Sequence, residues 1–233
     1  MIPSPPRSGA GSSRRQRGGE QVRVEAVCWD WNGTLLDDVE ICREAMNRVL
    51  TENGRPVIDD LDAYRHLFRF PIPNFYADLG LGGTAYHDAA SRYLDLVGES
   101  APRAGLQPGA RDALKGLAER GVQQILASAT PAPTLMAQLE PHHLTSVFGE
   151  VLSAEDAYHA SKRDVVASWL GRTGTPAERI VMIGDTNHDL EIADSLGMRF
   201  IHLTSGHQSL EGAGVHHIDS LDELDRALDR GWE

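Results

Sequence analysis

Lysine is scarce in this sequence. Only Lys115 and Lys162 are lysines among the 22 basic residues, whereas 34 residues are acidic and the formal net charge is −12. Proteins that bind nucleic acids or anionic membranes neutralise phosphates with clustered basic residues, so this balance argues against both kinds of partner. It does not argue against a small phosphorylated ligand, because one lysine and one bound cation can make a site locally positive.

Cysteine and long apolar runs are also scarce. The two cysteines, Cys28 and Cys42, are interpreted as packing residues in a reducing compartment and not as metal ligands. No apolar run is long enough to span a bilayer. Residues 1–20 are rich in Pro, Gly, Ser and Arg and lack the apolar segment of a signal peptide, which predicts a disordered tail. These features predict a cytoplasmic protein.

A short apolar segment ends at a carboxylate near the start of the chain. Residues 24–29 have the length and composition of a buried parallel strand, and they lead into Asp30-Trp-Asn-Gly-Thr34, where Asn-Gly is a turn signal. Open α/β sheets bind their ligands beyond the carboxyl ends of the strands. Asp30 is therefore predicted to be a nucleophile, a metal ligand or both, with an aspartate that only caps the turn as the alternative.

A second strand-like segment also ends at an aspartate. Ile180-Val-Met-Ile-Gly leads directly to Asp185, and Asp189 follows four residues later. Parallel strands deliver their last residues to the same edge of a sheet. The two segments can therefore place their carboxylates around one hard cation, which prefers oxygen ligands.

The 233 residues are enough for one large or two modest domains. From Pro108 onward, helical and strand patterns alternate, which predicts a doubly wound parallel sheet with helices on both faces. We assign residues 21–36 and 106–233 to this core. Residues 37–105 contain no convincing strand, and their pattern indicates helices broken by Gly and Pro. We expect them to form a separate cap, with helices packed on the sheet as the alternative.

The expected elements after the cap follow from periodicity and from end signals. Thr175-Pro-Ala-Glu178 matches the capping-box pattern with Pro at the first helical position, and only a short turn is expected between it and the next strand. Ser220-Leu-Asp-Glu223 also matches the pattern and is predicted to begin the last helix. The predicted helices cover residues 108–120, 161–170, 189–196 and a segment after 220, and the predicted strands cover residues 122–127, 148–152, 180–184 and 200–203.

Together, Asp30-x-x-Gly-Thr34 and Gly184-Asp-x-x-x-Asp189 resemble the first and fourth motifs of the haloacid dehalogenase superfamily. The chain looks like a member of its phosphoglycolate-phosphatase-like branch, and the resemblance covers nearly everything after residue 20. It implies a Rossmann-like core with a small helical cap inserted at residues 37–105. It also implies a Mg²⁺-dependent phosphatase of small phosphorylated metabolites, which we expect to be a monomer or a homodimer.

The resemblance also implies roles for individual residues. Asp30 would be the nucleophile that forms an aspartyl-phosphate, and Lys162 would be the cation beside it. Mg²⁺ would be held by Asp30, the backbone carbonyl of Asn32 and Asp185. Asp189 would be either a direct ligand of the metal or a residue that hydrogen-bonds to a ligand. The alternative for Asp189 is an aspartate that only stabilises the start of a helix. The implied phosphate contacts are Gly33, Thr34, Ser128 and Ala129, with Thr130 as the rival of Ser128.

Asn32 departs from the family pattern, which has a second aspartate at this position. An amide can neither give up nor take a proton at neutral pH, and general acid–base help is worth roughly 10²–10⁴-fold in rate. The chain is therefore expected to be a slow phosphatase, one that acts on good leaving groups, or one that recruits another acid. The alternative is a phosphate-binding or regulatory protein that does not hydrolyse its ligand.

Two groups of residues receive no functional role from the sequence. The aromatic stretch between Arg65 and Tyr76 could face a substrate, but such clusters more often form the core of a cap. His188 and the pairs His142-His143 and His216-His217 lack a ligand spacing and are expected to be solvated. Carbon–phosphorus cleavage, which in relatives uses a lysine of the cap, is not expected because residues 37–105 contain no lysine.

Overall fold

The computed structural model of the chain describes residues 23–153, 161–210, 212 and 214–229. The predicted disordered tail, residues 1–20, lies outside the described part of the chain. None of the described helices is both long enough and apolar enough to cross a membrane.

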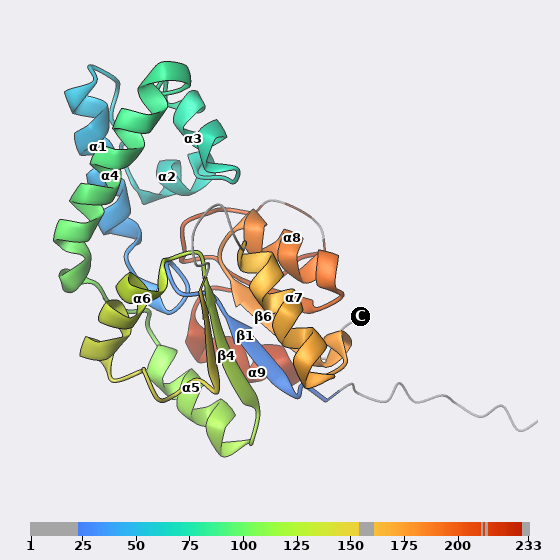
Figure 1. Ribbon diagram of the computed structural model, residues 1–233. Coiled ribbons are helices and arrows are strands. Elements are labelled where there is room, and N and C mark those ends of the chain that lie inside the picture. The colour runs from blue at the N-terminus through green and yellow to red at the C-terminus, as the bar shows by residue number, and fades with distance from the viewer. Residues whose placement is uncertain (1–22, 154–160, 211, 213, 230–233) are drawn as a thin grey trace, which may run out of the picture.

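A six-stranded parallel sheet lies at the centre of the core (Figure 1). Its strands are β1 (Ala26–Trp29), β4 (Gln123–Ser128), β5 (Glu150–Ser153), β6 (Ile180–Gly184), β7 (Arg199–Leu203) and β8 (His216–Ile218). They are arranged in the order β5-β4-β1-β6-β7-β8, so the chain builds outward in opposite directions from β1 and β6. The carboxyl ends of these two strands therefore form a topological switch point, where open α/β sheets bind ligands.

Helices cover both faces of the sheet, which confirms the predicted doubly wound α/β fold. They are α5 (Ala110–Glu119), α6 (Ala132–Leu139), α7 (Lys162–Thr173), α8 (Asn187–Leu196) and α9 (Leu224–Asp229). Because successive strand residues point to opposite faces, β1 buries Val27 and Trp29 against α5, α6 and α9. On the other face, Ala26 and Cys28 pack with α7 and α8. Both cysteines are buried and free, as expected.

The segment between β1 and β4 is helical and has a core of its own. It comprises α1 (Val39–Glu52), α2 (Leu61–Leu67), α3 (Ile72–Asp78) and α4 (Tyr86–Ser100), with the 3₁₀ turns η1 (Gly83–Ala85) and η2 (Ala101–Arg103). Its buried residues, among them Met46, Tyr64 and Phe75, form a cluster that contains no residue of the sheet. Figure 1 shows these helices beyond the ends of the strands, and their assignment as a separate cap domain stays a prediction.

A two-stranded antiparallel ribbon joins the helical segment to the core. Strand β2 (Leu36–Asp37) pairs with β3 (Gly105–Leu106), so Leu36 lies opposite Leu106 and Asp37 opposite Gly105. The chain therefore leaves the core and returns to it at adjacent points. The ribbon coincides with the predicted boundaries of the cap at residues 37 and 105.

The two predicted capping boxes differ from the structure. The box at Thr175 is wrong, because Pro176 instead precedes the 3₁₀ turn η4 (Ala177–Arg179) and no side chain caps it. Strand β6 begins directly after η4, which confirms the predicted short turn before the strand. Ser220 does accept a hydrogen bond from the Asp222 amide, but it opens the 3₁₀ turn η5 (Leu221–Glu223), and α9 follows only afterwards.

We predict that the core folds without the helical segment. In a variant with residues 39–103 replaced by a short Gly-Ser linker, the β2–β3 ribbon still holds the two chain ends together, and the two sheet cores lose none of their buried residues. Thermal unfolding should therefore show a cooperative transition, and circular dichroism should show the strands retained and the helix content lowered only by the loss of α1 to α4. A variant that is unfolded or only aggregates would show that residues 39–103 belong to the main domain.

Candidate active site

Three carboxylates meet at the switch point of the sheet. Asp30 follows β1 and Asp185 follows β6, and the two strands are adjacent, with Trp29 opposite Ile183. Oxygen atoms of Asp30, Asp185 and Asp189 all lie within 4.8 Å of one another. The structure thus brings together the carboxylates that the sequence placed at one sheet edge.

Lys162 bridges two of these carboxylates. Its ammonium group donates hydrogen bonds to Asp30 and, at 2.6 Å, to Oδ1 of Asp189. The lysine is only 4% exposed. Although burial opposes a charged amine, the two carboxylates raise the pKa of Lys162, so it stays protonated. Lys162 therefore neutralises part of the negative charge and fixes the positions of both partners.

Capping hydrogen bonds at the starts of α7 and α8 fix the positions of Lys162 and Asp189. Ser161 and Asp164 form a reciprocal capping box at the start of α7, which holds Lys162 at the first position of that helix. At the start of α8, Oδ2 of Asp189 accepts hydrogen bonds from the Thr186 hydroxyl at 2.7 Å and from the Thr186 amide at 3.2 Å. Asp189 thus serves as a helix cap with one oxygen and as the partner of Lys162 with the other.

The site retains an excess of negative charge. Burial, followed by repulsion from Asp189 and Asp185, raises the pKa of Asp30 well above its usual range despite the nearby Lys162. Burial and Asp189 also raise the pKa of Asp185 to about 6, against the opposing pull of His207. A hard divalent cation that takes carboxylate oxygens would remove this repulsion, and the donor set fits Mg²⁺.

The loop after β1 is packed tightly against Asp185. Gly33 has a φ of 76°, and a Cβ at this position would lie 2.2 Å from Oδ2 of Asp185, so only glycine fits. The Gly33 amide donates to Oδ1 of Asp38 at 2.8 Å, and the Thr34 hydroxyl donates to Oδ1 of Asp185 at 3.0 Å. Both residues lie in the site, where their assignment as phosphate contacts remains a prediction.

The side chain of Asn32 is held at both ends. Its Nδ2 donates to Oδ2 of Asp38 at 2.8 Å, and its Oδ1 accepts from the Thr130 hydroxyl at 2.8 Å. The amide of Thr130 donates in turn to the Ser128 hydroxyl oxygen at 3.1 Å. Thr130 is thus a partner of Asn32, which favours Ser128 as the hydroxyl that contacts a phosphate.

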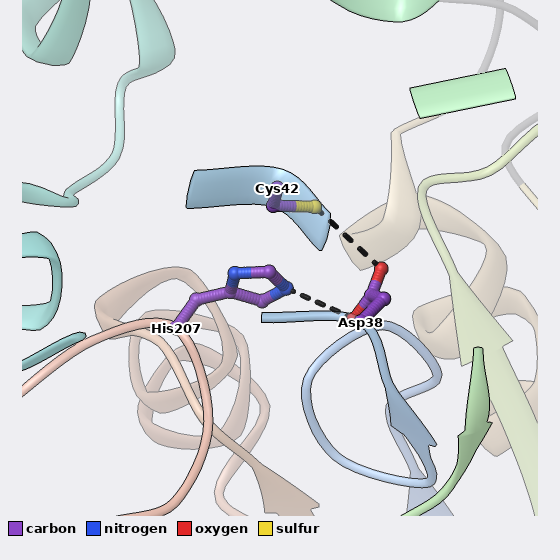
Figure 2. A group of neighbouring side chains, drawn as sticks. All are labelled: Asp38, Cys42 and His207. Atoms are coloured by element: carbon purple, nitrogen blue, oxygen red, sulfur yellow. Dashed lines mark hydrogen bonds and ion pairs between the residues drawn. The ribbon is translucent and has the colours of Figure 1, made fainter. Parts of the chain in front are cut away.

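Asp38 and His207 form a buried network that the sequence did not predict (Figure 2). Nε2 of His207 lies 3.2 Å from Oδ1 of Asp38, its Nδ1 lies 3.2 Å from the Tyr64 hydroxyl, and its backbone amide donates to Asp185 at 2.6 Å. Burial opposes a charged imidazole, but Asp38 outweighs it and raises the pKa of His207 to about 9. His207 is therefore a cation paired with Asp38, and it ties Tyr64 of the helical segment to Asp185.

Cys42 completes the group drawn in Figure 2, where Cys42, Asp38 and His207 point toward one another. Atoms of these three residues that could bind a metal lie within 4.8 Å of one another. However, the Asp38 oxygens already accept hydrogen bonds from Gly33 and Asn32. Burial also raises the pKa of the Cys42 thiol well above its usual range, which disfavours the thiolate that a metal requires. We interpret the group as a hydrogen-bonded support for the loop after β1.

The prediction that the histidines are solvated is wrong for two of the five. His188 is half-buried and its ring stacks on Phe70, with centroids 4.9 Å apart. His142 is half-buried and meets the edge of Trp31 at 6.2 Å. His143 and the 216–217 pair are exposed. Sequence spacing misses these contacts because the partners lie far away in the chain.

A cavity of about 880 Å³ lies between the helical segment and the carboxyl edge of the sheet. Its floor includes Asp30, Lys162 and Asp189, together with Asn32 and the 128–130 segment. Most of its upper wall comes from α1, α3 and α4 and from the loop that precedes α3. The site is therefore enclosed by residues of both parts of the chain.

Comparisons with known proteins agree with this geometry. A family model described as haloacid dehalogenase-like hydrolase matches residues 27–203. A phosphoglycolate phosphatase of Pseudomonas putida is 26% identical over 191 residues, which cover 78% of this chain and 70% of that protein. The tyrosine-protein kinase PtkA of Mycobacterium tuberculosis is 27% identical over 211 residues, which cover 88% of this chain and 72% of that protein.

Solved structures show the same fold. A haloacid dehalogenase-like hydrolase of Streptococcus pneumoniae matches with a TM-score of 0.73 at 19% identity, over 87% of this chain and 97% of that chain. The residues matched by the family model run from β1 to β7 and include the two motifs on which the resemblance rested. The resemblance is thereby confirmed. The chain belongs to the haloacid dehalogenase-like hydrolases and is similar to their phosphoglycolate-phosphatase-like branch.

Proposed function

We propose that this protein is a Mg²⁺-dependent phosphatase that hydrolyses small phosphorylated metabolites through an aspartyl-phosphate on Asp30. The observation that carries the proposal is the convergence of Asp30, Asp185 and Asp189 within 4.8 Å, with the ammonium group of Lys162 between two of them. The phosphatase relatives support the reaction type at the level of the family.

Asp30 is placed to attack a phosphoryl group from the edge of the sheet. In the first step the bond between the carboxylate oxygen and phosphorus forms while the bond to the leaving alcohol breaks. Lys162 lies beside Asp30 and would stabilise the negative charge on the phosphoryl oxygens. Ser128 and the loop at Gly33 and Thr34 would orient those oxygens.

Asp30, Asp185 and the backbone carbonyl of Asn32 would hold Mg²⁺, and Asp189 would support them. The bound ion would supply positive charge opposite the phosphoryl oxygens. Without it, the three buried carboxylates repel one another, and this repulsion adds to burial, the main cause of the raised pKa values of Asp30 and Asp185.

Asn32 determines which esters can react. Both ends of its amide are engaged, by Asp38 and by Thr130, and an amide transfers no proton to the leaving oxygen. Esters whose leaving group departs readily as an anion, such as acyl or aryl phosphates, therefore suit this site better than alkyl phosphates. The same residue supports the alternative that the protein binds a phosphorylated ligand without hydrolysing it.

We predict that Mg²⁺ raises the thermal midpoint of the wild type but not that of Asp185→Asn. The metal binds the ionised carboxylate, and Asp185 ionises above a pKa of about 6. The Mg²⁺-induced rise should therefore be present above pH 6 and shrink as the pH falls below it. Asp194→Asn, an exposed change in α8, the helix that follows Asp185, is the control. An equal shift in Asp185→Asn would remove Asp185 from the metal site.

Asp30→Asn should abolish turnover and leave the fold intact. The variant keeps the volume of the side chain but lacks the nucleophilic oxygen, and the loss of a carboxylate relieves repulsion within the site. Turnover of an aryl phosphate and the far-ultraviolet spectrum test the two parts of this statement. Appreciable residual activity in a folded Asp30→Asn protein would place the nucleophile elsewhere.

The missing proton donor at position 32 should be restored when Asn32 and its hydrogen-bond partner Asp38 exchange their side-chain types. Asn32→Asp alone would set a carboxylate against Asp38, whereas Asn32→Asp combined with Asp38→Asn keeps the net charge and the hydrogen bond between them. We predict that the double variant hydrolyses alkyl phosphates up to roughly 10²-fold faster than the wild type. Steady-state rates over a leaving-group series measure this. A wild type that is already fast on alkyl phosphates would mean that another residue supplies the proton.

A further inference from the structure

The cavity above Asp30 has an apolar upper wall. Residues from the helical segment, among them Met46, Ile72, Tyr86, Leu94 and Val97, line it together with Phe70. Phe70 is held in place, because its amide donates to Oδ1 of Asn187 at 2.9 Å and its ring stacks on His188. The sequence left open whether the aromatic stretch is core or faces a ligand, and in the structure it does both. Phe68, Phe70, Phe75 and Tyr76 all line the cavity, and of these Phe75 and Tyr76 are also buried in the core of the helical segment, whereas Phe68 and Phe70 are half-buried.

The cavity offers positive charge at one point only. Among its described lining residues, Lys162 is the sole lysine or arginine, and its ammonium group is already shared by Asp30 and Asp189. His207 also lines the cavity, but it is paired with Asp38. The other two lining histidines, His142 and His188, are half-buried and pack against the rings of Trp31 and Phe70.

A second anionic group on a ligand would therefore have no cationic partner on the upper wall. Moving an unpaired charge from water to an apolar wall is costly. Residues 154–160, which lie outside the described part of the chain, contain neither lysine nor arginine. A carboxylate or a second phosphate is thus disfavoured in the part of the ligand farthest from Asp30.

We infer that the ligand of this site is a phosphate monoester of an apolar alcohol or phenol that carries no second charged group. The phosphate lies on the floor of the cavity, and the organic group packs against the helices of the cap. The volume of about 880 Å³ accommodates an organic group much larger than glycolate. This ligand class narrows the substrate of the proposed function and rests on that function for the hydrolysis of the ester. Binding of the ligand can be measured without turnover. Phenols are also the better leaving groups, in agreement with Asn32 at the acid position.

Alkylphosphonates test the inference without hydrolysis, because their carbon–phosphorus bond is not cleaved by a phosphatase. The full chain with Mg²⁺ is titrated calorimetrically with a series from ethyl- to octylphosphonate. Each buried methylene should increase the affinity by up to about fourfold. Alkylphosphonates of the same length that carry a carboxylate at the end opposite the phosphonate should bind at least about tenfold more weakly. Affinity that does not depend on chain length, or equal affinity for the carboxylated series, would overturn the inference.

One exposed leucine, Leu94, and one exposed valine, Val57, provide a matched pair of variants. Leu94 lines the cavity and is 66% exposed, whereas Val57 belongs to the same helical segment, is 51% exposed and does not line it. Leu94→Arg should lower the affinity for octylphosphonate and raise that for its carboxylated counterpart, and Val57→Arg should change neither. Equal effects of the two variants would show that the organic group does not contact this wall.

Turnover separates this inference from the proposed function. If the phosphonates bind with the expected dependence on length but no phosphate ester is hydrolysed, the ligand class stands and the phosphatase proposal fails. If phosphate esters are hydrolysed and substrates with a second anionic group, such as phosphoglycolate, have the higher kcat/KM, the phosphatase proposal stands and the ligand class is overturned.

Discussion

The ion pairs of Lys162 with Asp30 and Asp189 are the interaction on which the site depends. Three carboxylates are buried at one edge of the sheet, and charges in such a place are tolerated only when they are paired. Lys162 pairs with two of them, and burial together with the neighbouring Asp189 raises the pKa of Asp185 to about 6. The arrangement therefore favours a cation or a proton, which is the property that a metal-assisted phosphatase uses.

The interactions that build the fold also build the site. Asp189 caps α8 with one oxygen and binds Lys162 with the other, so the start of a helix and the centre of the site share one residue. The same holds for the loop after β1, where Gly33 fits against Asp185 only because it has no side chain. A change at either position would alter backbone geometry and chemistry together.

The sequence predicted the parts of the site that follow from strand patterns. Asp30 and Asp185 each end an apolar run, and adjacent parallel strands bring such residues together. The sequence could not predict the pair of Asp38 and His207, which are 169 residues apart, because neither lies in a periodic pattern. Strand β8 was missed for a related reason: its His216-His217 pair gives no apolar alternation, and pairing with β7 alone makes it a strand. The apolar wall of the cavity likewise arises only when α3 and α4 pack together.

The central claim is that Asp30 receives the phosphoryl group and that Asn32 cannot activate water for its removal. The second step should then be slow, so the phosphorylated enzyme should accumulate. The most direct measurement is to mix the protein with an aryl phosphate and Mg²⁺, quench with acid and locate the phosphoryl group by mass spectrometry of peptides. The expected product is an adduct on Asp30. Turnover without an adduct there, or an adduct on a different residue, would place the nucleophile elsewhere.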